Sequence, residues 1–117
     1  MRHNEDNLQS VCFKWFYLKF AEYRGLLFHV PNGGLRTAAT AATMKRIGVV
    51  SGVADLLFLV PRGTYHGLCI EMKSLNGKQT KRQREWQQKV EQQGYKYVVC
   101  TSYEKFRETI KDYLCQH

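Results

Sequence analysis

Three charged residues interrupt a part of the sequence that is otherwise typical of a buried β-hairpin. Asp55 opens the apolar run "DLLFLV", and Glu71 and Lys73 lie in "LCIEMKS", which follows the turn "PRGTYHG". Burying a charge without a partner is costly, so each of these groups needs compensation. Alternate side chains of a strand share a face, so Glu71 and Lys73 should project together, away from Ile70.

Antiparallel pairing of the two strands should bring the three charges to one end of the hairpin. We expect the turn to pair Val60 with Leu68. Asp55 would then lie near Lys73 and close to Glu71. Two carboxylates suit a hard divalent cation, and an adjacent amine can orient water or stabilise charge on a phosphate. A simple ion pair at a strand end is the alternative, and the hairpin alone does not decide between the two.

Two further polar residues lie on the apolar stripes of predicted helices. Thr80 is a good N-cap, and Gln83 completes a capping box three residues later, on the same face as Trp86. Glu5 heads the apolar stripe of a helix expected from Glu5 to about Tyr23. Each has a structural explanation, because Gln83 can serve the cap and an acid is favoured at a helix N-terminus. Each could instead serve a site.

The rest of the chain alternates between strand and helix patterns. Strands are expected at 26–30, 55–60, 68–74 and 95–100. Helices are expected at 5–23, 35–47, 80–93 and from 102 toward the C-terminus. This order predicts an α/β fold in which helices flank a small mixed β-sheet. The length of 117 residues suits a single domain, which we assign to residues 1–117.

The composition is basic, with 18 Lys and Arg against 10 Asp and Glu and a formal net charge of +8. This excess favours a polyanionic partner such as nucleic acid, although a basic protein without such a partner is the alternative. No apolar run is long enough to span a bilayer and the N-terminal stretch is polar, so we expect a cytoplasmic protein with no membrane partner. Four widely spaced cysteines are expected to be reduced core residues rather than a zinc site.

Basic residues gather immediately after the hairpin. They are Lys73, Lys78, Lys81, Arg82, Arg84 and Lys89. Such a cluster can hold DNA phosphates without reading sequence, although a solvated helix face is the alternative. In "HVPNGG", Asn32 could contact a phosphate or merely form a tight turn. We expect His29 to pack or bond locally rather than to bind a metal.

Several motifs in order resemble the virus-type replication-repair nuclease (VRR-NUC) domain, a branch of the PD-(D/E)XK nuclease superfamily. The most specific are "FHVPNGGLR", "GVVSGVADLLFLVPRGTYHGLCIEMKSLNGKQT" and "QREWQQKVEQQGYKYVVCTSYEKF". The resemblance covers nearly the whole chain. It implies a restriction-endonuclease-like core and a phosphodiester hydrolase that acts on DNA with Mg²⁺ or Mn²⁺.

The resemblance also implies a role for each residue of the hairpin site. Asp55 and Glu71 match the metal-binding carboxylates, and the main-chain carbonyl of Met72 matches a further ligand. Lys73 matches the catalytic lysine. Ala54 stands where the family usually has a proline, a departure that removes backbone rigidity but no ligand.

Two residues outside the hairpin also match the family. Glu5 matches an acid that approaches the metals from the first helix, and Gln83 matches a catalytic glutamine three residues before a tryptophan. We therefore expect a stand-alone, bacterial or phage endonuclease acting in DNA repair on duplex or branched DNA, such as four-way (Holliday) junctions. A catalytically inactive DNA-binding protein, or a phage assembly subunit, with the same fold is the alternative.

A homodimer is also expected. Large apolar residues nearly encircle the first helix, namely Trp15, Phe16, Tyr17, Leu18 and Phe20. A helix that is apolar all round must be covered on more than one side. A partner chain could supply that cover, and the last helix or the 26–30 strand is the alternative.

Overall fold

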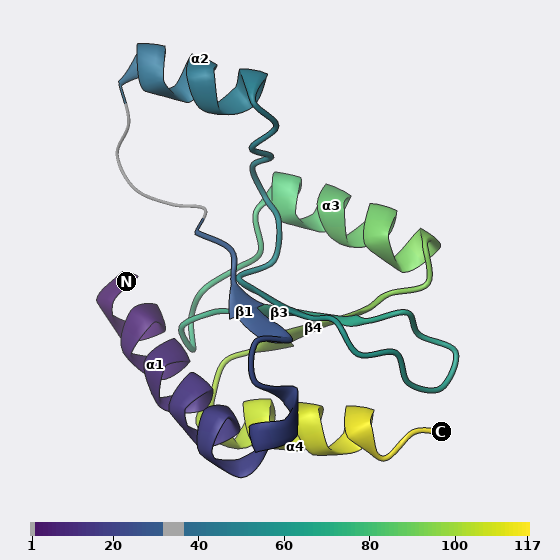
Figure 1. The fold of residues 1–117 in the computed structure, drawn as a ribbon. Coiled ribbons are helices and arrows are strands. Elements are labelled where there is room, and N and C mark those ends of the chain that lie inside the picture. The colour runs from purple at the N-terminus through teal and green to yellow at the C-terminus, as the bar shows by residue number, and fades with distance from the viewer. Residues whose placement is uncertain (1, 32–36) are drawn as a thin grey trace.

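The computed structural model describes residues 2–31 and 37–117 and contains a four-stranded sheet in the order β1-β2-β3-β4 (Figure 1). The strands are β1 (Leu27–His29), β2 (Leu56–Phe58), β3 (Leu68–Met72) and β4 (Lys96–Cys100). The first three pair antiparallel, whereas β4 runs parallel to β3. The expected α/β fold with a small mixed sheet is therefore confirmed.

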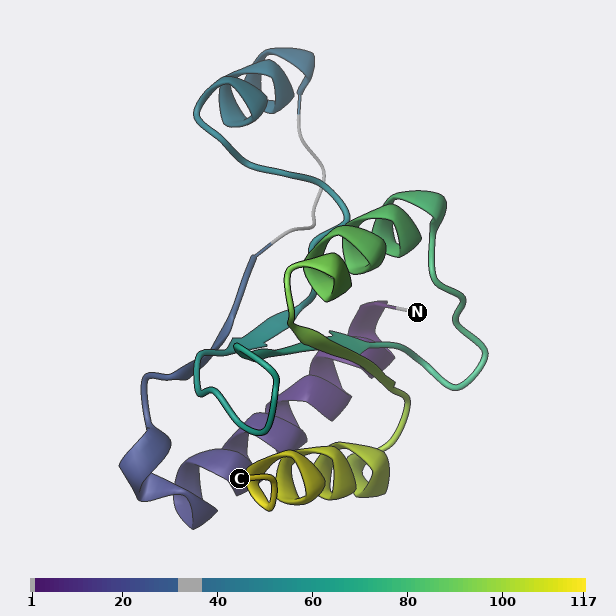
Figure 2. The same ribbon diagram turned by 90° about the vertical axis from the view of Figure 1, so that its right-hand side faces the viewer.

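Helices lie on both faces of this sheet. They are α1 (Arg2–Lys19), α2 (Ala38–Arg46), α3 (Lys81–Gln92) and α4 (Tyr103–Leu114), with a short 3-10 helix, η1 (Ala21–Tyr23), after α1. α1 and α4 cover one face and α3 covers the other, while α2 stands apart beyond α3 (Figure 1 and Figure 2). No helix in the described ranges is long and apolar enough to cross a membrane.

Side-chain hydrogen bonds mark where α3 and α4 begin. The Thr80 hydroxyl accepts from the Gln83 N–H, and the Gln83 side chain accepts from the Thr80 N–H. At α4, the Ser102 hydroxyl accepts from the Lys105 N–H. These bonds satisfy N–H groups that a helix leaves unpaired at its start, and they confirm both predicted caps.

The alternation of β3 separates two buried clusters. Leu68, Ile70 and Met72 belong to the larger cluster, together with residues of α1 and α4. Cys69 belongs to a smaller cluster beneath α3, and Glu71 faces the same side, where its carboxylate meets an α3 side chain. The predicted faces of this strand are therefore confirmed, and one of them carries a buried charge.

The register of the β2–β3 hairpin differs by two residues from the expected one. Leu68 pairs with Phe58 rather than with Val60. The Val60 carbonyl instead accepts a 2.6 Å hydrogen bond from the Tyr113 hydroxyl of α4. Pro61, the next residue, has no N–H to offer to a strand partner. Pairing therefore ends before Val60, and the connection between the strands is longer than expected.

Much of the aromatic surface of α1 is covered within the chain. Phe16 is buried, and its ring lies 5.4 Å from that of Phe58, centroid to centroid. The Trp15 ring packs edge-on against Tyr103 and Phe106 of α4. Two of the residues that suggest a partner chain are thus covered by the sheet and the last helix, and the homodimer stays a prediction.

Three of the cysteines are core residues. Cys12, Cys69 and Cys100 are buried and all four cysteines are free thiols, but Cys115 is exposed, so the expectation of a core residue is wrong for Cys115. Burial raises the pKa of the Cys12 thiol to about 12 and that of Cys69 to about 11. Both thiols therefore stay protonated at neutral pH, as expected of reduced cysteines that fill a core.

Candidate active site

Asp55 and Glu71 meet at one end of the hairpin. The β2–β3 register places Asp55 opposite Glu71, not opposite Lys73 as expected, and a shift of two residues leaves every side chain on its predicted face. The Asp55 Oδ2 atom accepts a 2.7 Å hydrogen bond from the Met72 N–H. The same register would pair Met72 with Ala54, so the Asp55 carboxylate takes the place of a main-chain acceptor.

Glu71 is a buried carboxylate with three polar partners. Its side chain is held in the sheet with 1% of the residue exposed. The Gln83 Nε2 atom donates to Oε2 over 2.7 Å, and the Tyr97 hydroxyl donates to Oε1 over 3.2 Å. The Lys73 ammonium lies 3.5 Å from Oε2, and only 12% of its side chain is exposed. Donors from α3, β4 and the end of β3 thus compensate both oxygens.

Gln83 serves the helix cap and the site at once. Its amide oxygen accepts a 2.8 Å hydrogen bond from the Thr80 N–H, which completes the capping box. Its amide nitrogen is then free to donate to Glu71. The two interpretations of this glutamine are therefore not exclusive, because each uses a different end of the amide. Its catalytic role stays a prediction.

The surroundings of Glu71 favour its neutral form. Burial and, next, the charge of Asp55 raise the pKa of Glu71 from 4.5 to about 7. The charge of Lys73 and the hydrogen bond from Tyr97 act in the opposite direction without cancelling the shift. A nearby cation would favour the ionised carboxylate, so this carboxyl group is suited to binding one.

The pKa of Asp55 is raised as well. Burial contributes most to raising the pKa of Asp55, and the charge of Glu5 raises it further. The Met72 N–H and the charges of His29 and Lys73 lower it. Glu5, at the start of α1, therefore acts on the site electrostatically. Two neighbouring acids whose pKa values are raised, chiefly by burial, mark this end of the hairpin as a candidate functional site.

The donor atoms at this end of the hairpin fit a divalent cation. Asp55 and Glu71 offer carboxylate oxygens, which hard cations prefer. The Met72 N–H points toward Asp55, and the N–H and C=O of a strand residue point to the same side, so we expect the Met72 carbonyl to face Asp55 too. No three His, Cys, Asp or Glu side chains of the described residues form a ready metal cluster. The ligand role of Glu5 therefore stays a prediction.

Tyr97 is a site neighbour that sequence patterns do not single out. Alternation in "YKYVVC" marks Tyr97 as inward-facing, but only the parallel pairing of Tyr97 with Cys69 shows that it lies beside Glu71. Burial, and next the Glu71 charge, raise the pKa of Tyr97, so its hydroxyl stays protonated and can donate. His29 hydrogen-bonds within the protein, but to a partner distant in the sequence, with Nδ1 3.0 Å from the Asp55 carbonyl oxygen.

The basic residues expected to bind DNA lie on α3 and the loop before it. Lys78 and Lys81 are exposed and make no hydrogen bond or ion pair with any described residue. Arg84 is partly occupied, because its Nη1 atom donates to the Gln79 carbonyl over 2.8 Å. Asn32 lies outside the described residues. The two free lysines are therefore the best placed of this set to meet a phosphate.

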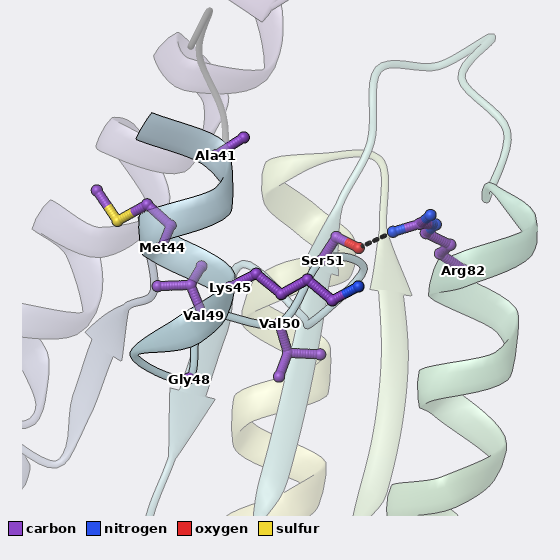
Figure 3. Close-up of a pocket in the computed structure, with 8 residues that line it drawn as sticks. All are labelled: Ala41, Met44, Lys45, Gly48, Val49, Val50, Ser51 and Arg82. Atoms are coloured by element: carbon purple, nitrogen blue, oxygen red, sulfur yellow. Dashed lines mark hydrogen bonds between the residues drawn. The ribbon is translucent and has the colours of Figure 1, made fainter. Parts of the chain in front are cut away.

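Arg82 lines a groove of about 620 Å³ between α3 and the segment that follows α2 (Figure 3). Its Nη1 atom donates to the Ser51 hydroxyl over 2.5 Å. Gly52 approaches α3 so closely that an added Cβ would lie 2.8 Å from the Arg82 backbone, so only glycine fits there. Lys45 lines the groove as well. The groove thus extends the basic surface from α3 toward α2.

The buried Glu71 predicts an unusual pH dependence of stability. Because its folded-state pKa is raised to about 7, its contribution is fully present below 4.5 and is lost as pH rises through 7. The free energy of unfolding without metal should therefore fall by up to roughly 3 kcal/mol from this group between pH 5 and 8. Mg²⁺ should reduce the loss. Thermal unfolding measured across this pH range checks the prediction. An equal fall in the free energy of unfolding of the Glu71→Gln variant would contradict it.

Comparisons with known proteins agree with this arrangement. The family model described as the VRR-NUC domain matches residues 2–104. A solved structure of a VRR_NUC domain protein aligns with a TM-score of 0.81 at 31% identity, covering 95% of this chain and 88% of that one. A search of curated proteins found no significant match. The match to the family model spans most of the sequence, and the chain therefore belongs to the VRR-NUC family of nucleases.

Proposed function

We propose that this protein is a divalent-metal-dependent DNA endonuclease. The observation that carries the proposal is the convergence of Asp55, Glu71 and Lys73 at one end of the hairpin. Gln83 joins them through its hydrogen bond to Glu71. A salt bridge alone would need one acid and one base, whereas this site holds a second, half-buried acid, Asp55, beside the buried Glu71. That excess of carboxylate suits Mg²⁺ or Mn²⁺.

In the proposed reaction, water adds across a P–O bond of the DNA backbone. The water oxygen bonds to phosphorus, the bond to one sugar oxygen breaks, and that oxygen takes up a proton. Asp55 and Glu71 would hold Mg²⁺ or Mn²⁺, which would supply Lewis-acid stabilisation of charge on the phosphate. Lys73, which lies 3.5 Å from Glu71, orients the attacking water or stabilises the developing charge.

We assign DNA binding to the basic residues beside the site. They are Lys78, Lys81, Arg82 and Arg84, and we add the neutral Asn32, which lies outside the described residues, as a further contact to a phosphate. Their contacts with phosphates would position the strand over Lys73 without reading its sequence. The groove that Arg82 lines offers a continuation of this path toward α2.

Branched DNA, such as a four-way junction met in DNA repair, is the proposed preferred substrate. A symmetric junction needs two cuts, and a two-fold homodimer would supply two sites with matching symmetry. Val11 and Leu18 support a partner, because they are 54% and 66% exposed and lie seven residues apart on one face of α1. The proposed setting is the cytoplasm of a bacterial or phage-infected cell.

The direct test incubates the purified protein with labelled linear, flap and four-way DNA, with and without Mg²⁺ or Mn²⁺. Metal-dependent cleavage that is fastest on four-way DNA would support the whole proposal. Equal cleavage of linear DNA would leave the endonuclease and remove the preference for junctions. Tight binding without cleavage at any metal concentration would instead favour an inactive DNA-binding or assembly protein.

Asp55→Asn and Glu71→Gln should each abolish cleavage and leave DNA binding nearly intact. Both changes keep an oxygen acceptor in place while removing a carboxylate that the metal needs. Without metal, both variants should be at least as stable as the wild type, because each removes one of two neighbouring carboxylate charges, those of the half-buried Asp55 and the buried Glu71. Cleavage rates, binding by fluorescence anisotropy and melting temperatures check this. Wild-type cleavage by either variant would eliminate the proposed site.

Gln83→Ala should slow cleavage at least tenfold, because it removes the hydrogen-bond donor of Glu71 Oε2 and leaves that oxygen only the Lys73 ammonium at 3.5 Å. It also removes part of the capping box, which costs about 1 kcal/mol. Thr80→Ala is the matched control, because it weakens the same cap without touching Glu71. Single-turnover cleavage and thermal unfolding measure both effects. If Thr80→Ala slows cleavage as much, Gln83 acts only through the helix.

Lys78→Glu combined with Lys81→Glu should weaken DNA binding regardless of sequence. Each lost phosphate contact should also reduce the slope of log affinity against log salt by about one. Lys105→Glu combined with Lys111→Glu is the control, because it makes the same charge change on α4, across the sheet from α3. Titrations at several salt concentrations give the slope. An unchanged slope in the double variant would place the DNA path elsewhere.

A further inference from the structure

Tyr97 holds the Glu71 oxygen that Gln83 does not reach. The Tyr97 side chain lies beneath α3 with 7% of the residue exposed, and its ring packs against Trp86 at a centroid distance of 6.2 Å. Its hydroxyl donates to Glu71 Oε1, whereas Gln83 donates to Oε2. A carboxylate bound at both oxygens by donors on different elements cannot rotate freely about its last bond.

A chain of hydrogen bonds fixes the direction in which the Tyr97 proton points. The Glu91 carboxylate can only accept, so it takes the Gln87 Nε2 donor at 3.2 Å and leaves the Gln87 Oε1 atom to accept. That oxygen accepts from Gln79 Nε2 at 2.8 Å. The second Gln79 N–H then points to the Tyr97 oxygen at 3.3 Å. The Tyr97 hydroxyl receives this bond, so its own proton is directed to Glu71.

One stripe of α3 thus reaches both oxygens of the buried acid. Gln83, Gln87 and Glu91 are spaced by four residues and share a face of the helix. Gln83 meets Glu71 directly, and Gln87 acts on it through Gln79 and Tyr97. The orientation of the carboxylate is therefore coupled to the placement of the whole helix.

We propose that Tyr97 is a positioning residue, which orients the Glu71 carboxylate for the divalent cation. This inference rests on the proposed function, since it assigns Tyr97 a role toward the same metal. Partners that orient a metal ligand typically contribute about 10- to 100-fold in metal affinity or activity. A tyrosine that merely filled the space under α3 would contribute through its ring, which packs on Trp86, and not through its hydroxyl.

Tyr97→Phe separates these two roles because it keeps the ring and removes the hydroxyl. Tyr95→Phe is the matched control: Tyr95 is half-buried in the same cluster, and its hydroxyl makes no hydrogen bond within the described part of the chain. Mn²⁺ binding is measured without DNA, from the EPR signal of the free ion. Melting temperature, kcat and KM for DNA are measured alongside.

We expect Tyr97→Phe to bind Mn²⁺ at least tenfold more weakly and to lose a similar factor in kcat. KM for DNA should be unchanged, and Tyr95→Phe should match the wild type. Wild-type Mn²⁺ affinity and kcat in Tyr97→Phe would overturn the inference and leave the proposed function standing, as would an equal loss in Tyr95→Phe. A wild-type protein that neither binds Mn²⁺ nor cleaves DNA would overturn both.

Discussion

The burial of the Glu71 carboxylate beside Asp55 is the constraint on which the rest of the site depends. Two acids facing one another in a sheet repel, and burial removes the water that would screen them. Three donors from different elements stabilise the Glu71 carboxylate: Gln83 of α3, Tyr97 of β4 and the ammonium of Lys73. The pKa of Glu71 nevertheless stays raised, to about 7. The donors therefore do not fully compensate the negative charge of the two carboxylates, and the remaining charge attracts a cation.

The parallel pairing of β3 and β4 makes this arrangement possible. Parallel neighbours need a crossover, and here the crossover contains α3, which packs over the face that carries Glu71. The first turn of the helix therefore lies close to the acid. Its capping residue, Gln83, contributes one end of its amide to the helix and the other to the site. Helix initiation and carboxylate orientation thus share a residue, and a change at Gln83 affects both.

The two faces of the sheet have different roles: one carries the main apolar core and the other carries the candidate site. The face toward α1 and α4 holds an apolar cluster that includes Phe16 and Phe106, and supplies most of the buried hydrophobic surface. The face toward α3 is smaller and more polar, and it borders the exposed lysines at 78 and 81. The strands that carry the site are thereby held in place by an apolar core on their opposite face, which includes Ile70 and Met72.

The sequence by itself determined the features that depend on neighbouring residues: the helix caps at Thr80 and Ser102, the alternation that separates the faces of β3, and the presence of charges in an apolar hairpin. Tertiary structure decided the register, because the hydroxyl of Tyr113, far along the chain, binds the Val60 carbonyl and ends the pairing early. It also decided the cover of α1 by α4 and the contact of Tyr97 with Glu71. These contacts depend on how elements distant in the sequence pack together, and the spacing of neighbouring residues does not encode that packing.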